Sequence, residues 1–173
     1  MLGIRVGSFL GYSAIGFAKR MKSYNPHSKL ICIDTWLGSA EHFQTDGNHD
    51  RRLGWENGYP TMYYKFISNV ISNNVQDIII PLPFPSTTGY KILNRVFEEL
   101  NIKSDFAYID GSHEEDEVYM DLYNYYQLIN DNSFLCGDDW SWSSVSNDVK
   151  KFSDTNGLVY KVLENNVHWI INK

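Results

Sequence analysis

The stretch Ser133–Trp140, "SFLCGDDW", is an apolar run that reaches a glycine and then two adjacent aspartates, Asp138 and Asp139. The earlier stretch "DFAYIDGSH" (105–113) follows the same pattern and ends its apolar run at Asp110. Short apolar runs bounded by turn residues are typical of buried strands in a parallel sheet. Because like charges repel and lose hydration near an interior, the paired aspartates predict a compensating cation or strong hydrogen-bond donors.

Outward from these two stretches, strand-like runs alternate with segments of helical periodicity. The expected strands are residues 4–6, 29–34, 77–82, 105–110 and 133–139, with a closing hairpin of 158–164 and 168–173. The expected helices have inner faces at Ile15-Ala18-Met21, Met62-Phe66-Val70, Ile92-Val96-Leu100 and Val118-Leu122-Tyr125-Ile129, and a last one covers 145–156 before Gly157. This order predicts an α/β fold with a Rossmann-like, doubly wound, mostly parallel sheet and a C-terminal antiparallel hairpin.

In such sheets ligands bind beyond the C-terminal ends of the strands, where Asp110, Asp138 and Asp139 are expected to lie. One helix joins their two strands, so the strands are expected to be neighbours about 4.8 Å apart. Three converging carboxylates suit Mg²⁺ or a similar divalent cation. The alternative is that Asp139 caps a turn and that Asp138 alone is functional.

His113 follows Asp110 where the chain is expected to turn into a helix. An imidazole titrates near neutral pH and could act as a general base beside the metal. Alternatively, His113 is a helix-start residue satisfied by the acids that follow it. Ser112 and Glu115 have the spacing of a capping box, which predicts that the helix opens there.

The stretch "VGSFLGYSA" (6–14) places Gly7 directly after the first strand, where a ligand could approach the backbone. Ser13 is expected to cap the following helix. The spacing from Gly7 to Gly11 differs from the dinucleotide fingerprint, which argues against an NAD-dependent sugar-modifying enzyme. Asp34 ends the second strand, where an acid can accept hydrogen bonds from ribose hydroxyls; a capping or turn aspartate is the alternative.

Residues 35–60 form a long segment between the second strand and the next helix, and we expect a lid or acceptor loop there. It carries His42, His49, Trp36 and Trp55, and Trp140 and Trp142 follow the aspartate pair. These aromatic rings could stack on a sugar or an aromatic acceptor, although partial burial is the simpler explanation for any single tryptophan.

Composition excludes several classes of partner. The formal net charge is -6 over 173 residues with no cluster of lysine and arginine, which argues against binding to nucleic acid. No apolar run approaches the roughly 20 residues that span a bilayer, so no membrane partner is expected. Cys32 and Cys136 lie in apolar strand-like runs and are interpreted as reduced core residues, which predicts a cytoplasmic protein.

Four stretches, "VGSFLGYSA", "ICIDTWLGS", "YIDGSHEEDEVYMDL" and "FLCGDDW", resemble the class I S-adenosylmethionine-dependent methyltransferases. More narrowly they resemble the metal-dependent sugar O-methyltransferases of the macrocin/mycinamicin type, and more distantly catechol O-methyltransferase. The resemblance runs from residue 5 to about 152. It implies one methyltransferase domain over residues 1–173, short at its N-terminus.

The resemblance also implies roles for individual residues. S-adenosylmethionine would be bound by the first loop, the ribose-binding acid and the end of the fourth strand, namely Gly7, Ser8, Gly11, Tyr12, Ser13, Asp34, Asp110 and Gly111. The ligands of Mg²⁺ or another divalent cation would be Asp110, Asp138 and Asp139, and the catalytic base would be His113. The acceptor would be a small molecule or a glycan. The sequence leaves the oligomeric state open, a homo-oligomer included.

Two departures from the family pattern keep other functions open. Arg5 stands where an acid usually precedes the first glycine, and the sequence lacks the helices that usually precede the first strand. These departures favour a non-catalytic module that binds a nucleoside-like ligand. Within enzymes, the alternative is an O-methyltransferase for small, catechol-like phenols.

Overall fold

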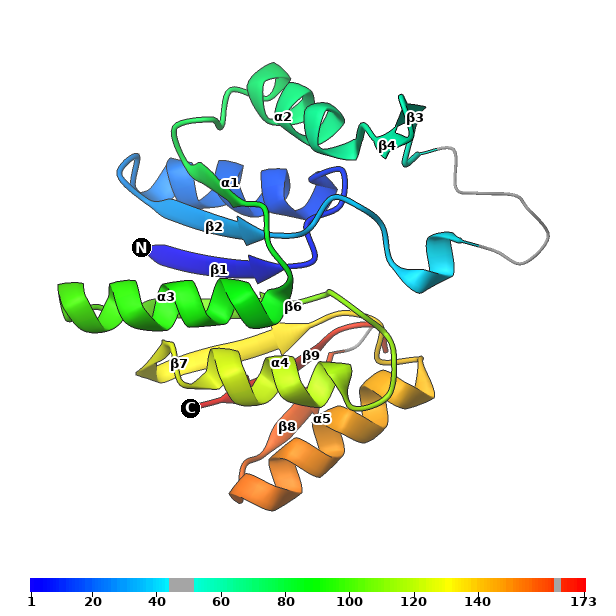
Figure 1. Cartoon of the computed structure of the whole chain (residues 1–173). Helices are drawn as coiled ribbons and strands as arrows, with labels where there is room; N and C mark the ends of the chain where they lie inside the picture. Colours follow the sequence, from blue (N-terminus) through cyan, green and yellow to red (C-terminus); the bar gives the residue numbers. More distant parts are fainter. Residues whose placement is uncertain (44–51, 164–165) are drawn as a thin grey trace.

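The computed structural model describes residues 1–43, 52–163 and 166–173. Its main sheet has seven strands in the order β5-β2-β1-β6-β7-β9-β8. The strands are β1 (Leu2–Val6), β2 (Lys29–Ile33), β5 (Ile79–Leu82), β6 (Ser104–Ile109), β7 (Ile129–Gly137), β8 (Tyr160–Val162) and β9 (Trp169–Asn172). The first five are parallel, and β9 is antiparallel to both β7 and β8 (Figure 1). The predicted doubly wound sheet with a closing antiparallel hairpin is confirmed.

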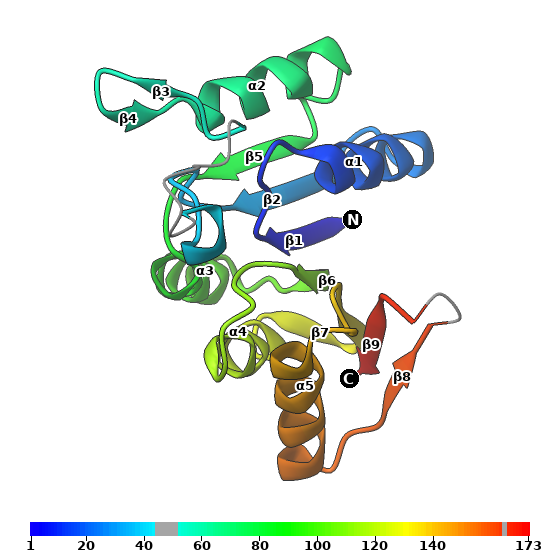
Figure 2. The ribbon, with the colours of Figure 1, turned by 90° about the vertical axis from the view of Figure 1, so that its right-hand side faces the viewer.

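Helices cover both faces of the sheet. They are α1 (Tyr12–Tyr24), α2 (Met62–Ser72), α3 (Ser86–Leu100), α4 (Glu117–Tyr126) and α5 (Ser143–Asn156). Figure 2 shows α1 and α2 on one face and α3, α4 and α5 on the other. Each face has its own apolar core, one centred on Phe66 and Met62 and the other on Leu122, Tyr125 and Val149. Because both faces are covered, the central strands are buried on both sides and mostly apolar, as their sequences predicted; Arg5 in β1 is a buried, charged exception.

The start of α4 differs from the prediction. The helix begins at Glu117 after Asp116, which has a φ of 66° and makes no side-chain cap. Ser112 Oγ instead accepts a hydrogen bond of 3.2 Å from the amide of Glu114. The predicted capping box is therefore wrong, and residues 111–116 form an irregular loop beyond the C-terminal end of β6. Ile129, expected on the inner face of this helix, begins β7.

The described parts of the 35–60 segment are anchored to the α2 side of the sheet. Trp36 and Leu53 are fully buried there, and the Trp36 ring contacts the rings of Tyr63 and Phe66. The segment also contains the short helix η1 (Ala40–His42) and a two-stranded hairpin of β3 (Trp55–Glu56) and β4 (Tyr59–Pro60). His49 lies outside the described residues. Over the described ranges, no helix is long and apolar enough to cross a membrane.

Candidate active site

A cavity of about 570 Å³ opens at the C-terminal ends of β1, β2, β5 and β6. Its walls come from the turns after these four strands, from η1 and from the start of α4. The lining includes Gly7, Asp34, His42, Ser86, Asp110, Gly111, His113 and Asp121. The cavity is within the size range of small-molecule sites, and it lies where ligands of doubly wound sheets bind.

Gly7 is required by the packing between two strand ends. Its φ is 78°, and a Cβ at this position would lie 1.7 Å from the carbonyl oxygen of Asp110. The amide of Asp110 donates a 3.0 Å hydrogen bond to the carbonyl oxygen of Val6. The backbone after β6 thus fills the space beside Gly7, whereas the sequence suggested an approach by ligand. Gly7 and Gly111 nevertheless both line the cavity.

Beyond Gly7, the first glycine loop contributes Phe9 to the cavity lining, but most of its other residues do not line it. Ser8, Gly11, Tyr12 and Ser13 are not among its lining residues. Ser8 is buried, and the Tyr12 side chain is 96% exposed. The helix α1 is preceded by Gly11 with a φ of 90° and has no side-chain cap, so the predicted cap by Ser13 is wrong. The Ser13 hydroxyl instead accepts hydrogen bonds from the guanidinium of Arg5.

Asp34 joins the two turns that follow β1 and β2. Its Oδ2 accepts a 2.7 Å hydrogen bond from the amide of Phe9, and its Oδ1 accepts one of the same length from the amide of Trp36. The Trp36 indole donates back to the carbonyl oxygen of Phe9 at 2.8 Å. Asp34 therefore shapes the cavity wall in addition to lining it. Each carboxylate oxygen has two lone pairs and can accept a further hydrogen bond.

Asp110 is paired with the buried guanidinium of Arg5. Arg5 Nη2 lies 2.5 Å from Asp110 Oδ2, and the guanidinium stands over the ring of Tyr108. Burial raises the pKa of Asp110 to about 6, and Arg5 opposes that rise. Arg5 itself is only 3% exposed. A cation of the protein thus already contacts one of the predicted metal ligands.

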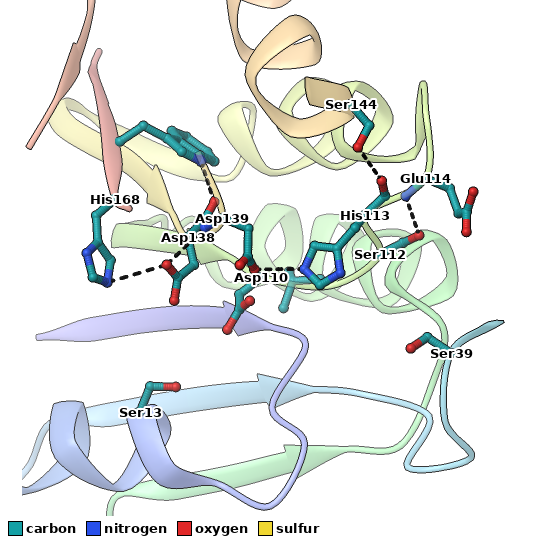
Figure 3. A network of polar contacts seen from close by, with 12 residues as sticks. Ser13, Ser39, Asp110, Ser112, His113, Glu114, Asp138, Asp139, Ser144 and His168 are labelled. Carbon is teal, nitrogen blue, oxygen red and sulfur yellow. Dashed lines mark hydrogen bonds and ion pairs between the residues drawn. The ribbon is translucent and has the colours of Figure 1, made fainter. Parts of the chain in front are cut away.

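His113 and Asp139 meet across the ends of β6 and β7, as Figure 3 shows. The distance from His113 Nε2 to Asp139 Oδ2 is 2.8 Å, and this contact holds the pKa of Asp139 below its usual value. The backbone carbonyl of His113 accepts a 2.6 Å hydrogen bond from Ser144, and the Trp142 ring lies against the imidazole at 4.7 Å between centroids. The imidazole is therefore held in place from two sides.

The structure brings together a somewhat different set of potential metal ligands from the one expected. Among the described residues, Asp110, His113 and Asp139 each offer one ligand atom within 4.8 Å of the others. Asp138 is not in this group. Its Oδ1 accepts a hydrogen bond from the amide of Asp139 and lies 3.6 Å from His168 Nε2 (Figure 3). Two carboxylates and one imidazole fit a divalent cation in ligand type and spacing.

Asp121 is a cavity residue that sequence reasoning missed. It comes from α4, is 4% exposed, and forms a hydrogen bond with Ser86 at the start of α3. Burial raises its pKa to about 7. In the sequence, Asp121 lies beside Leu122 in an amphipathic helix and resembles an ordinary polar-face residue. Only the packing of α4 beside α3 reveals that it faces the cavity.

Residues 4–140 match the model of a family described as "Methyltransferase domain". This chain belongs to the methyltransferase domain family. The match includes all four strand ends that line the cavity, as well as Asp138 and Asp139. The prediction of a methyltransferase is thus confirmed. No curated protein sequence is similar enough to this chain to count as a match.

Solved methyltransferase structures share the fold of this chain at low sequence identity. CalS11, described as a TDP-rhamnose 3'-O-methyltransferase of calicheamicin biosynthesis, has a TM-score of 0.65 and 14% identity over 99% of this chain and 71% of its own. The O-methyltransferase NovP has a TM-score of 0.69 and 12% identity over 98% and 70%. An O-methyltransferase from Bacillus cereus in complex with SAH has a TM-score of 0.62 and 12% identity over 99% and 74%. These likenesses confirm the class I methyltransferase fold.

Proposed function

We propose that this methyltransferase transfers a methyl group from S-adenosylmethionine to a hydroxyl of a sugar or glycan, with the help of a divalent cation. The observation that carries the proposal is the position of the Asp110, His113 and Asp139 group at the edge of the strand-end cavity. The sugar acceptor is supported by the description of CalS11 and by the half-exposed Trp142 ring beside His113. Aromatic faces of this kind are suited to stacking on an acceptor ring.

The donor would lie along the strand ends. Asp34 would accept hydrogen bonds from its ribose hydroxyls, and Gly7 and Gly111 would border it without side chains. Asp110 and Asp139 would hold the cation. The family resemblance implies Asp138 as a further ligand, but its carboxylate lies toward His168, so we expect it to contribute less. When bound, S-adenosylmethionine supplies an activated methyl group and the cation supplies positive charge beside the acceptor oxygen.

His113 would remove the proton from the acceptor hydroxyl as general base. Asp139 would orient the imidazole through Oδ2, and its carboxylate would also supply negative charge to the cation. Ser144 and Trp142 keep His113 at the cavity edge while the acceptor is positioned. The remaining contribution of the protein is to hold donor and acceptor in line, which is a large part of catalysis in group transfer.

The donor can be tested by thermal unfolding with S-adenosylhomocysteine. A ligand present at 100 times its Kd stabilises the folded state by about 2.7 kcal/mol, which corresponds to a Tm increase of roughly 5–11 °C in a chain of this size. We expect such an increase for the wild-type protein and a smaller one for Asp34→Ala. An unchanged Tm at saturating ligand would exclude the donor site.

The acceptor can be tested by following methyl transfer to nucleotide sugars and to catechols, each with Mg²⁺ and with a chelator. We expect metal-dependent transfer to a sugar. Transfer to catechols alone would favour the small-phenol alternative. A protein that binds S-adenosylhomocysteine but methylates neither class under any metal condition would favour the non-catalytic nucleoside-binding module.

A further inference from the structure

Arg5 is the one buried lysine or arginine among the residues that the structure describes. It lies in β1, between Cys32 of β2 and Tyr108 of β6. The ion pairs of Lys22 with Asp77, Arg95 with Glu99 and Lys151 with Asp116 are at the surface. A buried guanidinium keeps its charge and needs a partner, because desolvation of an unpaired ion is very costly.

The contacts of Arg5 leave Asp110 as its acidic partner. Its Nε and Nη2 donate to the hydroxyl of Ser13, and Nη1 donates to the carbonyl oxygen of Val6 at 3.2 Å. The remaining contact is the 2.5 Å ion pair with Asp110 Oδ2. Three neutral or backbone contacts therefore aim the guanidinium at one carboxylate. That carboxylate is also one of the potential ligands of a cation.

We propose that Arg5 is a built-in counter-cation that holds Asp110 in the metal-free protein and competes with a divalent cation for it. The competing half of this proposal rests on the metal site of the proposed function. Two positive charges beside one carboxylate repel each other, so Arg5 should weaken divalent binding and set the concentration at which the site fills. The same guanidinium should offset the repulsion among the aspartates that follow β6 and β7 when no metal is bound.

The first half can be tested without metal, by a double-mutant cycle of Arg5→Met and Asp110→Asn in a chelating buffer. Removing one partner of a buried ion pair is strongly destabilising, and we expect Arg5→Met to lower the Tm by roughly 10 °C. Adding Asp110→Asn should recover part of this loss, because the unpaired acid is gone. Strictly additive losses would show that Arg5 only packs β1 against α1.

The second half can be tested by calorimetric titration with Mg²⁺ and with Mn²⁺ alone. We expect Arg5→Met to bind the divalent cation roughly tenfold more tightly than wild type. Mutations of groups that contact metal ligands typically change metal affinity by this order of magnitude. Mg²⁺ should also raise the Tm of Arg5→Met more than that of wild type. If Arg5→Met does not fold without metal, Arg5→Gln serves instead, because it removes the charge and keeps a hydrogen-bond donor near Ser13, and it should also bind Mg²⁺ more tightly than wild type. Arg5→Lys keeps the charge, and its Mg²⁺ affinity should stay near that of wild type.

The outcomes separate this proposal from the proposed metal site. Equal Mg²⁺ affinities in wild type and Arg5→Met would show that Arg5 does not compete with the cation for Asp110, and the proposed metal site would stand. No binding by either protein would overturn the metal site and competition together, and the metal-free cycle would still decide the counter-cation role. The matched control is Lys22→Met, which breaks the exposed ion pair with Asp77. It should change neither the Mg²⁺ affinity nor the Mn²⁺ affinity.

Discussion

The imidazole of His113 and the carboxylate of Asp139 are in contact between the turns that follow β6 and β7, with Nε2 2.8 Å from Oδ2. The contact joins a potential base to a potential metal ligand. It also lowers the pKa of Asp139, which keeps that carboxylate charged toward acidic pH. The two residues therefore have to be tested with separate readouts for proton transfer and for metal binding.

His113→Gln should separate a base from a metal ligand. Glutamine keeps a polar side chain but cannot take up a proton, so we expect kcat to fall by about 10²–10⁴. Calorimetry should show an unchanged Mg²⁺ affinity if His113 is only the base. A drop of Mg²⁺ affinity by 10-fold or more, on the scale of other metal-site perturbations, would instead place His113 among the ligands.

Asp139→Asn and Asp138→Asn form a matched pair of neighbouring, shape-conserving changes. We expect Asp139→Asn to weaken Mg²⁺ binding by roughly 10–100-fold, because its carboxylate belongs to the group with Asp110. Asp138→Asn should weaken it less, since the Asp138 carboxylate faces His168. Equal losses in the two titrations would favour the three-aspartate site that the family resemblance implies.

Asp121→Asn should change how stability depends on pH. The folded-state pKa of Asp121 is raised to about 7, so its favourable contribution is present below the unfolded value of 3.8 and is lost as pH rises through 7. At pH 8 the neutral amide should stabilise the protein relative to wild type by on the order of 4 kcal/mol, and at pH 4 the two should be similar. Urea unfolding at both pH values measures the difference, and Asp77→Asn is the exposed control.

Gly7→Ala and Gly16→Ala should have opposite effects. At Gly7 the new Cβ would collide with the Asp110 carbonyl in a left-handed backbone, so we expect a loss of roughly 3 kcal/mol or more. At Gly16, in an exposed part of α1, nothing lies within 4 Å of the new Cβ, and we expect a gain of about 0.5–1 kcal/mol. Denaturant midpoints compare the two; a mild effect at Gly7 would contradict the close packing of the strand ends.

Trp36→Ala and Trp55→Ala test which tryptophan anchors the segment after β2. Trp36 is 1% exposed and hydrogen-bonded to Phe9, so its truncation should cost about 3–5 kcal/mol. Trp55 is 48% exposed, and its loss should cost less than about 1 kcal/mol. Similar losses in thermal unfolding would mean that the short hairpin contributes more to the fold than its exposure indicates.

The fold was predictable from sequence because helices on both faces make each central strand a short apolar run. Asp34, Asp110 and the pair Asp138-Asp139 could be found for the same reason, since each ends such a run. The hairpin of β3 and β4 was missed although Asn57-Gly58 is a strong hairpin signal, and both residues have the positive φ that such turns require. A two-residue strand offers too little apolar pattern to draw attention to its turn.

The errors at the site came from side-chain partners on other elements and from one local backbone conformation. Ser13 has the residue type of a helix cap, but Arg5 of the neighbouring strand takes its hydroxyl. The turn before α4 has the spacing of a capping box, but Asp116 adopts a left-handed backbone there. Asp121 faces the cavity only because α4 packs beside α3. Local patterns carry no information about such neighbours.

The central position of β1 has a consequence for the synthesis of this chain. The amide of Leu2 bonds the side chain of Asp105, 103 positions later, and β1 pairs with β6 along its length. At a synthesis rate of about 5–20 residues per second, β6 is made roughly 5–20 s after β1. During this time the edge of β1 that pairs with β6 in the folded protein has no partner strand, and unpaired strand edges pair readily with other chains. We expect nascent chains to be most prone to aggregation in this interval, before β6 emerges.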